Sequence, residues 1–131
     1  MRISKKVERW FPAPEDPDKS EHLIRNLLPG EEEDIYIENS SQETKYIKKG
    51  DELEPEVYQK SNLNLISQII RVKAIADWKN MYDENGNVLK CTTENKIRAL
   101  REIEGYKEFI DKCRAKLKAD IKDEKAVLEK N

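Results

Sequence analysis

The dipeptide Asn85-Gly86 constrains the fold of this chain more than any other feature of its sequence. Asn-Gly is the strongest short signal for a β-hairpin, because both central residues of a type I′ turn need a positive φ and these two residue types tolerate it. We therefore expect the chain to reverse at Gly86. An extended element should end near Trp78, and the chain should return through Val88-Leu89.

A helix start follows the return segment. Thr92-Thr93 precedes Glu94 and an apolar run with helical spacing over residues 97–103. A threonine in this position is typical of an N-cap, and an acidic residue near the positive end of the helix dipole stabilises the helix. We expect Gly105 to end this helix and a second helix to follow.

The second helix carries one apolar stripe with spacings of four, three, four, four and seven residues. Its members are Tyr106, Ile110, Cys113, Leu117, Ile121 and Leu128. The stripe is either part of the core or a face offered to another helix, and core is the commoner role. We expect residues 122–131 to fray.

The N-terminal half predicts strands, a loop and a short helix. Residues 4–11 have strand character, and prolines within 12–18 require a loop. Residues 21–28 favour a strand that pairs back on 4–11, with a short helix as the competing interpretation. Pro29-Gly30 before four acidic residues predicts a short helix near 30–38. The polar residues 38–56 should form a mobile loop or a protruding hairpin.

Residues 57–78 fit two patterns. The apolar side chains of 65–76 share one helical face, yet those of 70–78 also alternate as in a strand. Because β-branched residues favour a strand and the segment leads into the turn at Gly86, we prefer a long strand over 65–78.

Length and composition are those of one charged domain. The chain has 131 residues, enough for a single core, and 40% of them are charged against 37% hydrophobic. We expect one α+β domain over residues 1–121, in which an N-terminal β-hairpin or small antiparallel sheet packs against two C-terminal helices. A frayed tail at 122–131 completes the chain.

Charge is distributed unevenly along the sequence. Residues 1–14 carry four basic and one acidic side chain, 15–56 carry five and fourteen, and 57–131 carry sixteen and twelve. This disfavours nucleic acid as the main partner, since such binding scales with the number of phosphates neutralised. The basic start is either a phosphate contact or a strand edge whose lysines discourage pairing.

No pattern of catalytic or metal-binding residues stands out. The single histidine, His22, is expected to be a hydrogen-bonded structural or surface side chain. Asp83 and Glu94 lie at the first and last positions of an EF-hand-like spacing, but the required glycine is misplaced, which favours an ordinary turn. Cys91 and Cys113 fit small buried thiols in a reducing compartment. We expect no enzyme activity, no metal and no cofactor.

One pattern resembles a known family. Trp78, the turn Asp83–Asn87, the return Leu89–Cys91 and the helix start Thr92–Lys96 are similar to a pattern in the tail assembly chaperones of tailed bacteriophages and prophages. The opening of the chain, with a Pro/Asp loop, Leu-Ile-Arg-x-Leu and Pro-Gly-Glu over residues 12–31, resembles theirs as well. The polar segment 38–56 and Lys90 depart from the pattern.

The resemblance implies a non-enzymatic role in tail assembly. Such a protein covers the long helical tape-measure protein until tail-tube subunits polymerise around it. The expected partners are therefore the tape-measure protein or other tail proteins, with a possible homo-oligomer. The expected contact surface consists of seven aromatic and aliphatic side chains: Tyr106, Phe109, Ile110, Leu117, Ile121, Trp10 and Phe11.

Two alternatives remain open. One is a structural tail or connector subunit that forms rings and stays in the particle. The other is a small regulatory protein that acts through its acidic segment 15–56. Because we see neither an apolar leader after Met1 nor an apolar run of membrane-spanning length, we expect a cytoplasmic protein of the bacterial host without membrane contact.

Overall fold

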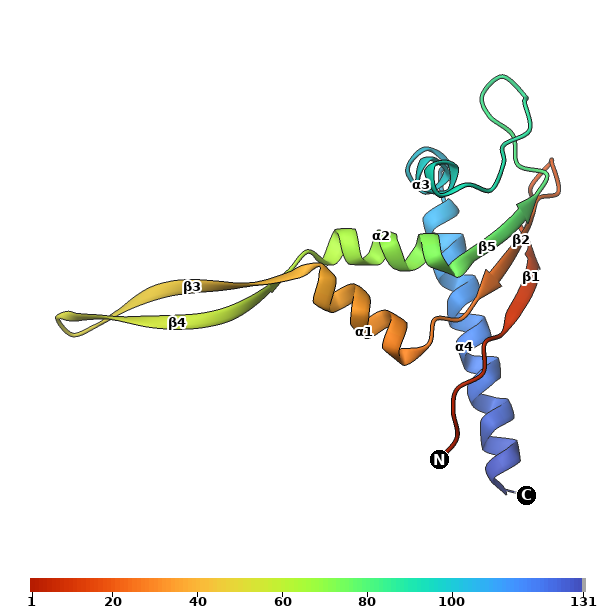
Figure 1. The fold of residues 1–131 in the computed structure, drawn as a ribbon. Helices are drawn as coiled ribbons and strands as arrows, with labels where there is room; N and C mark the ends of the chain where they lie inside the picture. Colours follow the sequence, from red (N-terminus) through yellow and green to blue (C-terminus); the bar gives the residue numbers. More distant parts are fainter. Residues whose placement is uncertain (131) are drawn as a thin grey trace.

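A three-stranded antiparallel sheet lies beside the long C-terminal helix (Figure 1). The computed structural model describes residues 1–130, with side chains through Val127. Strands β1 (Glu8–Pro12), β2 (Glu21–Arg25) and β5 (Ile75–Lys79) have the order β1-β2-β5. Helices α3 (Thr93–Glu102) and α4 (Tyr106–Lys130) share one core with the sheet. The predicted α+β class, a small antiparallel sheet packed against C-terminal helices, is confirmed.

The pairing of β1 with β2 is the one predicted for residues 4–11 and 21–28, in shorter form. Trp10 lies opposite Leu23, and Phe11 lies opposite His22. Burial alternates along β2, where His22 and Ile24 are buried and their neighbours are half-buried. This is the period of a strand, so the competing helix is wrong.

We call the sheet together with α3 and α4 the body of the molecule. Between β2 and β5 the chain runs out from this body and returns to it. Helix α1 (Pro29–Glu38) leads out, strands β3 (Ser40–Lys49) and β4 (Glu52–Ser61) form an antiparallel hairpin, and α2 (Leu63–Ala74) leads back. Figure 1 shows the hairpin projecting away from the sheet and from α4. The short helix predicted near 30–38 is confirmed. Of the two forms expected for 38–56 the structure has the protruding hairpin, which continues to Ser61.

The predicted long strand over 65–78 is wrong for residues 65–74, which form α2. Asn62 begins this helix, because its side-chain oxygen accepts the N–H of Leu65 at 3.2 Å. Ile66 and Ala74 then lie two helical turns apart and are both buried. Burial of this helical face in the core stabilises the helix by more than the strand preference of the β-branched residues disfavours it. The strand begins only at Ile75.

The chain reverses at Gly86 as predicted, but not through a type I′ turn. Of the two residues Asn85 and Gly86, only Gly86 has a positive φ, of 79°. The Gly86 N–H donates to the Asp83 carbonyl at 3.0 Å, and the Asp83 N–H donates to the Asn87 carbonyl at 2.9 Å. These bonds are typical of a three-residue loop that ends in a left-handed glycine.

Trp78 ties the return segment to the sheet. Its buried indole donates from Nε1 to the carbonyl oxygen of Leu89 at 2.7 Å. Thr92 then caps α3, since its Oγ1 accepts the N–H of Asn95 at 3.2 Å. Gly105, with a φ of 79°, separates α3 from α4. The extended element, turn, return and two helices predicted for this region are all present.

Helix α4 continues through the segment that was expected to fray, as far as Lys130. Fraying describes motion, which a single structure does not show. The expected fraying of residues 122–131 and the domain boundary at 121 therefore stay predictions. Asn131 and the side chain of Leu128, the last member of the predicted stripe, lie outside the described residues. Within residues 1–130, no helix is both long and apolar enough to cross a membrane.

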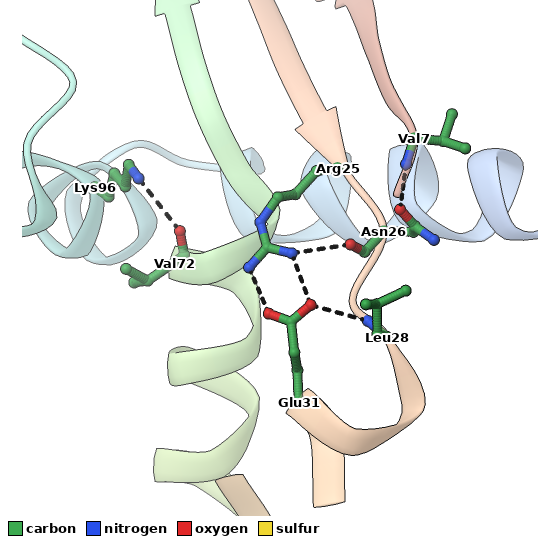
Figure 2. Close-up of polar contacts among 7 residues, drawn as sticks. All are labelled: Val7, Arg25, Asn26, Leu28, Glu31, Val72 and Lys96. Carbon is green, nitrogen blue, oxygen red and sulfur yellow. Dashed lines mark hydrogen bonds and ion pairs between the residues drawn. The ribbon is translucent and has the colours of Figure 1, made fainter. Parts of the chain in front are cut away.

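An ion pair fixes the start of α1 to β2 (Figure 2). Arg25 donates from Nη1 and Nη2 to the two carboxylate oxygens of Glu31, at 3.1 and 2.8 Å. Glu31 Oε1 also accepts the N–H of Leu28 at 3.1 Å. The Arg25 guanidinium and the Leu28 amide hold the pKa of Glu31 at about 2. These contacts set the direction in which α1 leaves the sheet.

Candidate functional site

The apolar stripe on α4 lies in the core. Tyr106, Ile110 and Leu117, three of the seven predicted contact residues, are buried in the cluster that α4 forms with the sheet and α2. Of the two roles left open for the stripe, the structure has the core role for these three. A partner cannot reach them unless α4 separates from the body.

The other four predicted contact residues are half-buried. Phe109 and Ile121 pack against the core from α4, and Phe11 packs against it from β1. Trp10 lies under the ammonium group of Lys79, whose Nζ is 4.3 Å from the ring centroid. These four keep some accessible surface, and the contact role proposed for the set of seven stays a prediction.

His22 stands in a buried polar cluster that the sequence did not predict. Its Nε2 lies 2.9 Å from Ser20 Oγ, and its Nδ1 lies 3.0 Å from the hydroxyl of Tyr106. Both ring nitrogens therefore have partners, which confirms the expectation of a hydrogen-bonded structural histidine. Burial lowers the pKa of His22 to about 4 and raises the pKa of Tyr106 well above its usual range. The imidazole is thus neutral near pH 7.

The cluster does not have the geometry of a catalytic triad. In a triad a carboxylate orients the histidine nitrogen that faces away from the serine, and here the Tyr106 hydroxyl occupies that place. Asp16 lies on the serine side instead, accepting the N–H of Ser20 at 3.1 Å. Ser20 is itself buried. The cluster holds the loop between β1 and β2 against α4. Its sequence signal is the spacing of two between His22 in β2 and Ser20 directly before β2, which puts both side chains on the same side of the extended chain.

A cleft of about 690 Å³ lies beside this cluster. The loop at residues 13–20, the end of β5 and the junction of α3 with α4 surround it. Asp18, Glu104, Glu108 and Lys112 contribute to its wall. With Asp16 also in the wall, four carboxylates stand against one ammonium group, so the net charge of the cleft is negative.

Metal binding finds no support among the described residues, where no three His, Cys, Asp or Glu side chains gather as a metal site would need. The EF-hand-like spacing is a turn, since the Asp83 carboxylate accepts the N–H groups of Asn85 and Asn87, each at 2.9 Å. Cys91 and Cys113 are free thiols, and burial raises the pKa of Cys113 to about 11.

The acidic segment 15–56 does not form one patch. It runs from the loop beside β5 through α1 to the tip of the hairpin, and Figure 1 shows these parts at opposite ends of the molecule. Several of its carboxylates are already paired, including Glu31 with Arg25 and Glu54 with Lys49. The charge asymmetry of the sequence is therefore dispersed in the fold.

The hairpin has two faces of different chemistry. Directly opposed residues of an antiparallel pair point to the same side. The apolar face, as we call it here, consists of Ser40, Gln42, Thr44, Tyr46 and Lys48 with Leu53, Pro55, Val57, Gln59 and Ser61. The charged face consists of Ser41, Glu43, Lys45, Ile47 and Lys49 with Glu52, Glu54, Glu56, Tyr58 and Lys60. Lys48 is the one charged member of the apolar face.

Side chains of the charged face have polar partners within the hairpin, whereas the apolar side chains of the other face are exposed to solvent. On the charged face, Tyr58 donates to Glu43 at 2.7 Å, and Lys60 pairs with the same carboxylate at 3.5 Å. On the apolar face, Tyr46, Leu53 and Val57 remain 68%, 67% and 62% exposed. An isolated two-stranded hairpin is only marginally stable in water. A partner that covered the apolar face would therefore remove exposed apolar surface from water and stabilise the hairpin.

A protruding hairpin was one of the two forms expected for 38–56, and a further signal in the sequence marks the position of its turn. Acidic and apolar residues alternate over 52–57, directly after Gly50-Asp51, a dipeptide that commonly forms a two-residue hairpin loop. Comparisons with protein-family models, with curated proteins and with solved structures find no match to this chain. The assignment of function therefore depends on the residues themselves.

Proposed function

We propose that this chain is a non-enzymatic protein-binding protein that covers an apolar surface of another protein during assembly. The projecting hairpin carries the proposal, because it exposes Tyr46, Leu53 and Val57 together on a nearly uncharged face. Contiguous apolar surface of this kind marks interaction sites in soluble proteins. The body, with its buried core, serves as the carrier of this surface.

The resemblance of the Trp78-to-Lys96 region to phage tail assembly chaperones supports a specific partner, the tape-measure protein. A chaperone of this kind must bind reversibly, since tail-tube subunits displace it. A small interface suits that requirement, because interfaces of limited area are typical of transient complexes. The apolar face offers three exposed apolar side chains, Tyr46, Leu53 and Val57, so an interface formed by it alone is small.

Co-expression with a phage tape-measure protein tests the proposal. We expect the tape-measure protein to become soluble, to be retained with the tagged chain in affinity purification, and to form a complex of defined mass in light scattering. Expression of the tape-measure protein with an empty vector is the control. If its solubility is the same in both cases, the chaperone role is refuted.

A structural tail or connector subunit is the second candidate. The same projecting hairpin favours it, since an arm of this kind can reach a neighbouring copy in a ring. The two candidates differ in the behaviour of the chain alone. A closed ring in light scattering, together with retention in purified particles, would support the structural subunit and contradict the chaperone.

A further inference from the structure

We infer that a groove along the C-terminal half of α4 binds an extended acidic segment of another protein, in which carboxylates stand beside apolar side chains. Figure 1 shows the N-terminal segment, residues 1–7, next to this half of α4. The groove lies between the two, and none of its residues belongs to the hairpin. The inference therefore goes beyond the proposed function and does not depend on it.

Two adjoining hollows of about 240 and 140 Å³ form the groove, and Ser4 and Ile121 line both of them. Leu27 contributes to the wall of the larger hollow, and Val7 contributes to the wall of the smaller one. Val7, Leu27 and Ile121 are half-buried side chains that pack against the core. The floor of the groove is thus apolar, and part of it is accessible to a partner.

Asn26 holds the N-terminal wall of the groove in place. Its Oδ1 accepts the N–H of Val7 at 2.7 Å, as Figure 2 shows, and its Nδ2 donates to the Lys5 carbonyl at 2.8 Å. The backbone N–H of Asn26 also donates to the Val7 carbonyl at 3.1 Å. The wall is therefore formed before a partner arrives, so binding does not have to order it.

The rim of the groove is basic on both sides, because six cationic side chains line it against two carboxylates. The cations are Arg2, Lys5, Arg25, Arg114, Lys118 and Lys125, and the carboxylates are Glu32 and Glu124. On α4 the cations lie at i−7, i−3 and i+4 from Ile121, which places them on the same face of the helix. Arg25 and Arg114 have partners in Glu31 and Glu32. Among the described residues, Arg2, Lys5 and Lys118 form no ion pair.

An acidic segment with apolar side chains complements both features of the groove. Its carboxylates meet the unpaired cations of the rim, and its apolar side chains cover the floor between them. From Arg114 to Lys125 the helix rises about 17 Å, at roughly 1.5 Å per residue. About five or six residues of an extended chain, at roughly 3.3 Å each, span this length.

A nucleic acid fits the groove less well. Glu32 and Glu124 interrupt the row of cations, whereas binding of nucleic acid gains with each phosphate that is neutralised. A phosphate backbone also leaves the apolar floor uncovered. Because a peptide can place carboxylates and apolar side chains next to each other, we assign the groove to a protein partner.

Binding of labelled peptides to the full chain tests the inference. The probe is a synthetic peptide of about eight residues, in which leucines stand among glutamates. One comparison peptide has glutamine in place of each glutamate, and another has serine in place of each leucine. Fluorescence anisotropy should show that the probe binds at least about tenfold more tightly than either, because each comparison peptide lacks one of the two complementary features.

Charge reversal on the two walls locates the site. Lys118→Glu on α4 should weaken binding of the probe at least about tenfold, and so should Arg2→Glu combined with Lys5→Glu on the N-terminal segment. These side chains are exposed, so the substitutions leave the core intact. Circular dichroism verifies that all variants keep the fold.

Lys107→Glu is the matched control for Lys118→Glu. It makes the same change of charge at an exposed position of α4, about 17 Å along the helix from Lys118. That separation exceeds the Debye length of about 8 Å at physiological ionic strength, so the affinity for the probe should change less than about twofold.

Several outcomes would overturn the inference. Equal binding of the glutamine peptide would contradict the charge argument, and equal binding of the serine peptide would show that the apolar floor is not used. Equal weakening by Lys107→Glu would show that the probe responds only to net charge. A labelled oligothymidine that binds as tightly as the probe would identify nucleic acid as the occupant. A dimer of the free chain that Lys118→Glu dissociates would identify a second copy instead.

Discussion

Lowering the pH from 7 to 5 should reduce the free energy of unfolding of this protein by about 2 kcal/mol, and His22 should account for most of the loss. The pKa of His22 is lowered from 6.5 to about 4 because its imidazole is buried. Between these two values the unfolded chain binds one proton more than the folded protein. Stability is therefore fully present above pH 6.5 and falls by about 1.4 kcal/mol per pH unit below it.

The chain is well suited to this measurement because His22 is its one histidine. Glu31 has a pKa of about 2 in the folded state and of 4.5 in the unfolded chain, so its contribution to the free energy of unfolding is lost only below pH 4.5. Urea unfolding at pH 7, 6 and 5 measures the free energies directly. The imidazole proton resonances of the folded protein should titrate with a midpoint near pH 4.

His22→Gln is the control variant. Glutamine stays neutral over this range, so the variant should be less stable than the wild type at pH 7 yet nearly insensitive to pH between 7 and 5. If the wild type and the variant lose stability in parallel, or if the His22 resonances titrate near pH 6.5, the burial and pairing of this imidazole do not control the acid response.

Three further substitutions, one of them with a matched control, test the fold. Glu31→Gln should lower the free energy of unfolding by about 1 kcal/mol near pH 7, a value that allows for the solvent exposure of the ion pair with Arg25. Urea unfolding should show this difference from the wild type vanish as the pH falls from 4.5 toward 2. Gly105→Ala should cost about 1–2 kcal/mol because φ is 79° there, whereas Gly30→Ala within α1 should be neutral or stabilising in the same thermal scans. Leu117→Ala should cost about 2–5 kcal/mol by creating a core cavity, and a loss below 0.5 kcal/mol would contradict its burial.

The parts of the fold that the sequence predicted are those with local signals. Asn85-Gly86 marks a turn, Thr92 marks a helix start and Gly105 marks a break, since each depends on the backbone preference of one or two residues. The segment 65–74 was mispredicted because its apolar residues satisfy a helical and an extended pattern equally. Only the position of the core relative to Ile66 and Ala74 decides between them.

The candidate site was harder to predict than the fold. Amphipathic spacing identified Ile110 and Leu117 on α4 but could not tell a core face from a partner face, because both bury the same apolar stripe. The cluster around His22 joins Ser20 to Tyr106 across 86 positions. No single-sequence pattern links residues so far apart.

The hairpin can change length only in certain steps without losing its apolar face. Each strand contributes alternate residues to the two faces. Removing two residues from each strand near the root would shorten the projection by about 7 Å and leave Tyr46 and Val57 on the same side of the ribbon relative to the body. Removing one residue from each strand would turn them to the opposite side. Related chains that use this surface should therefore differ in hairpin length by even numbers of residues per strand.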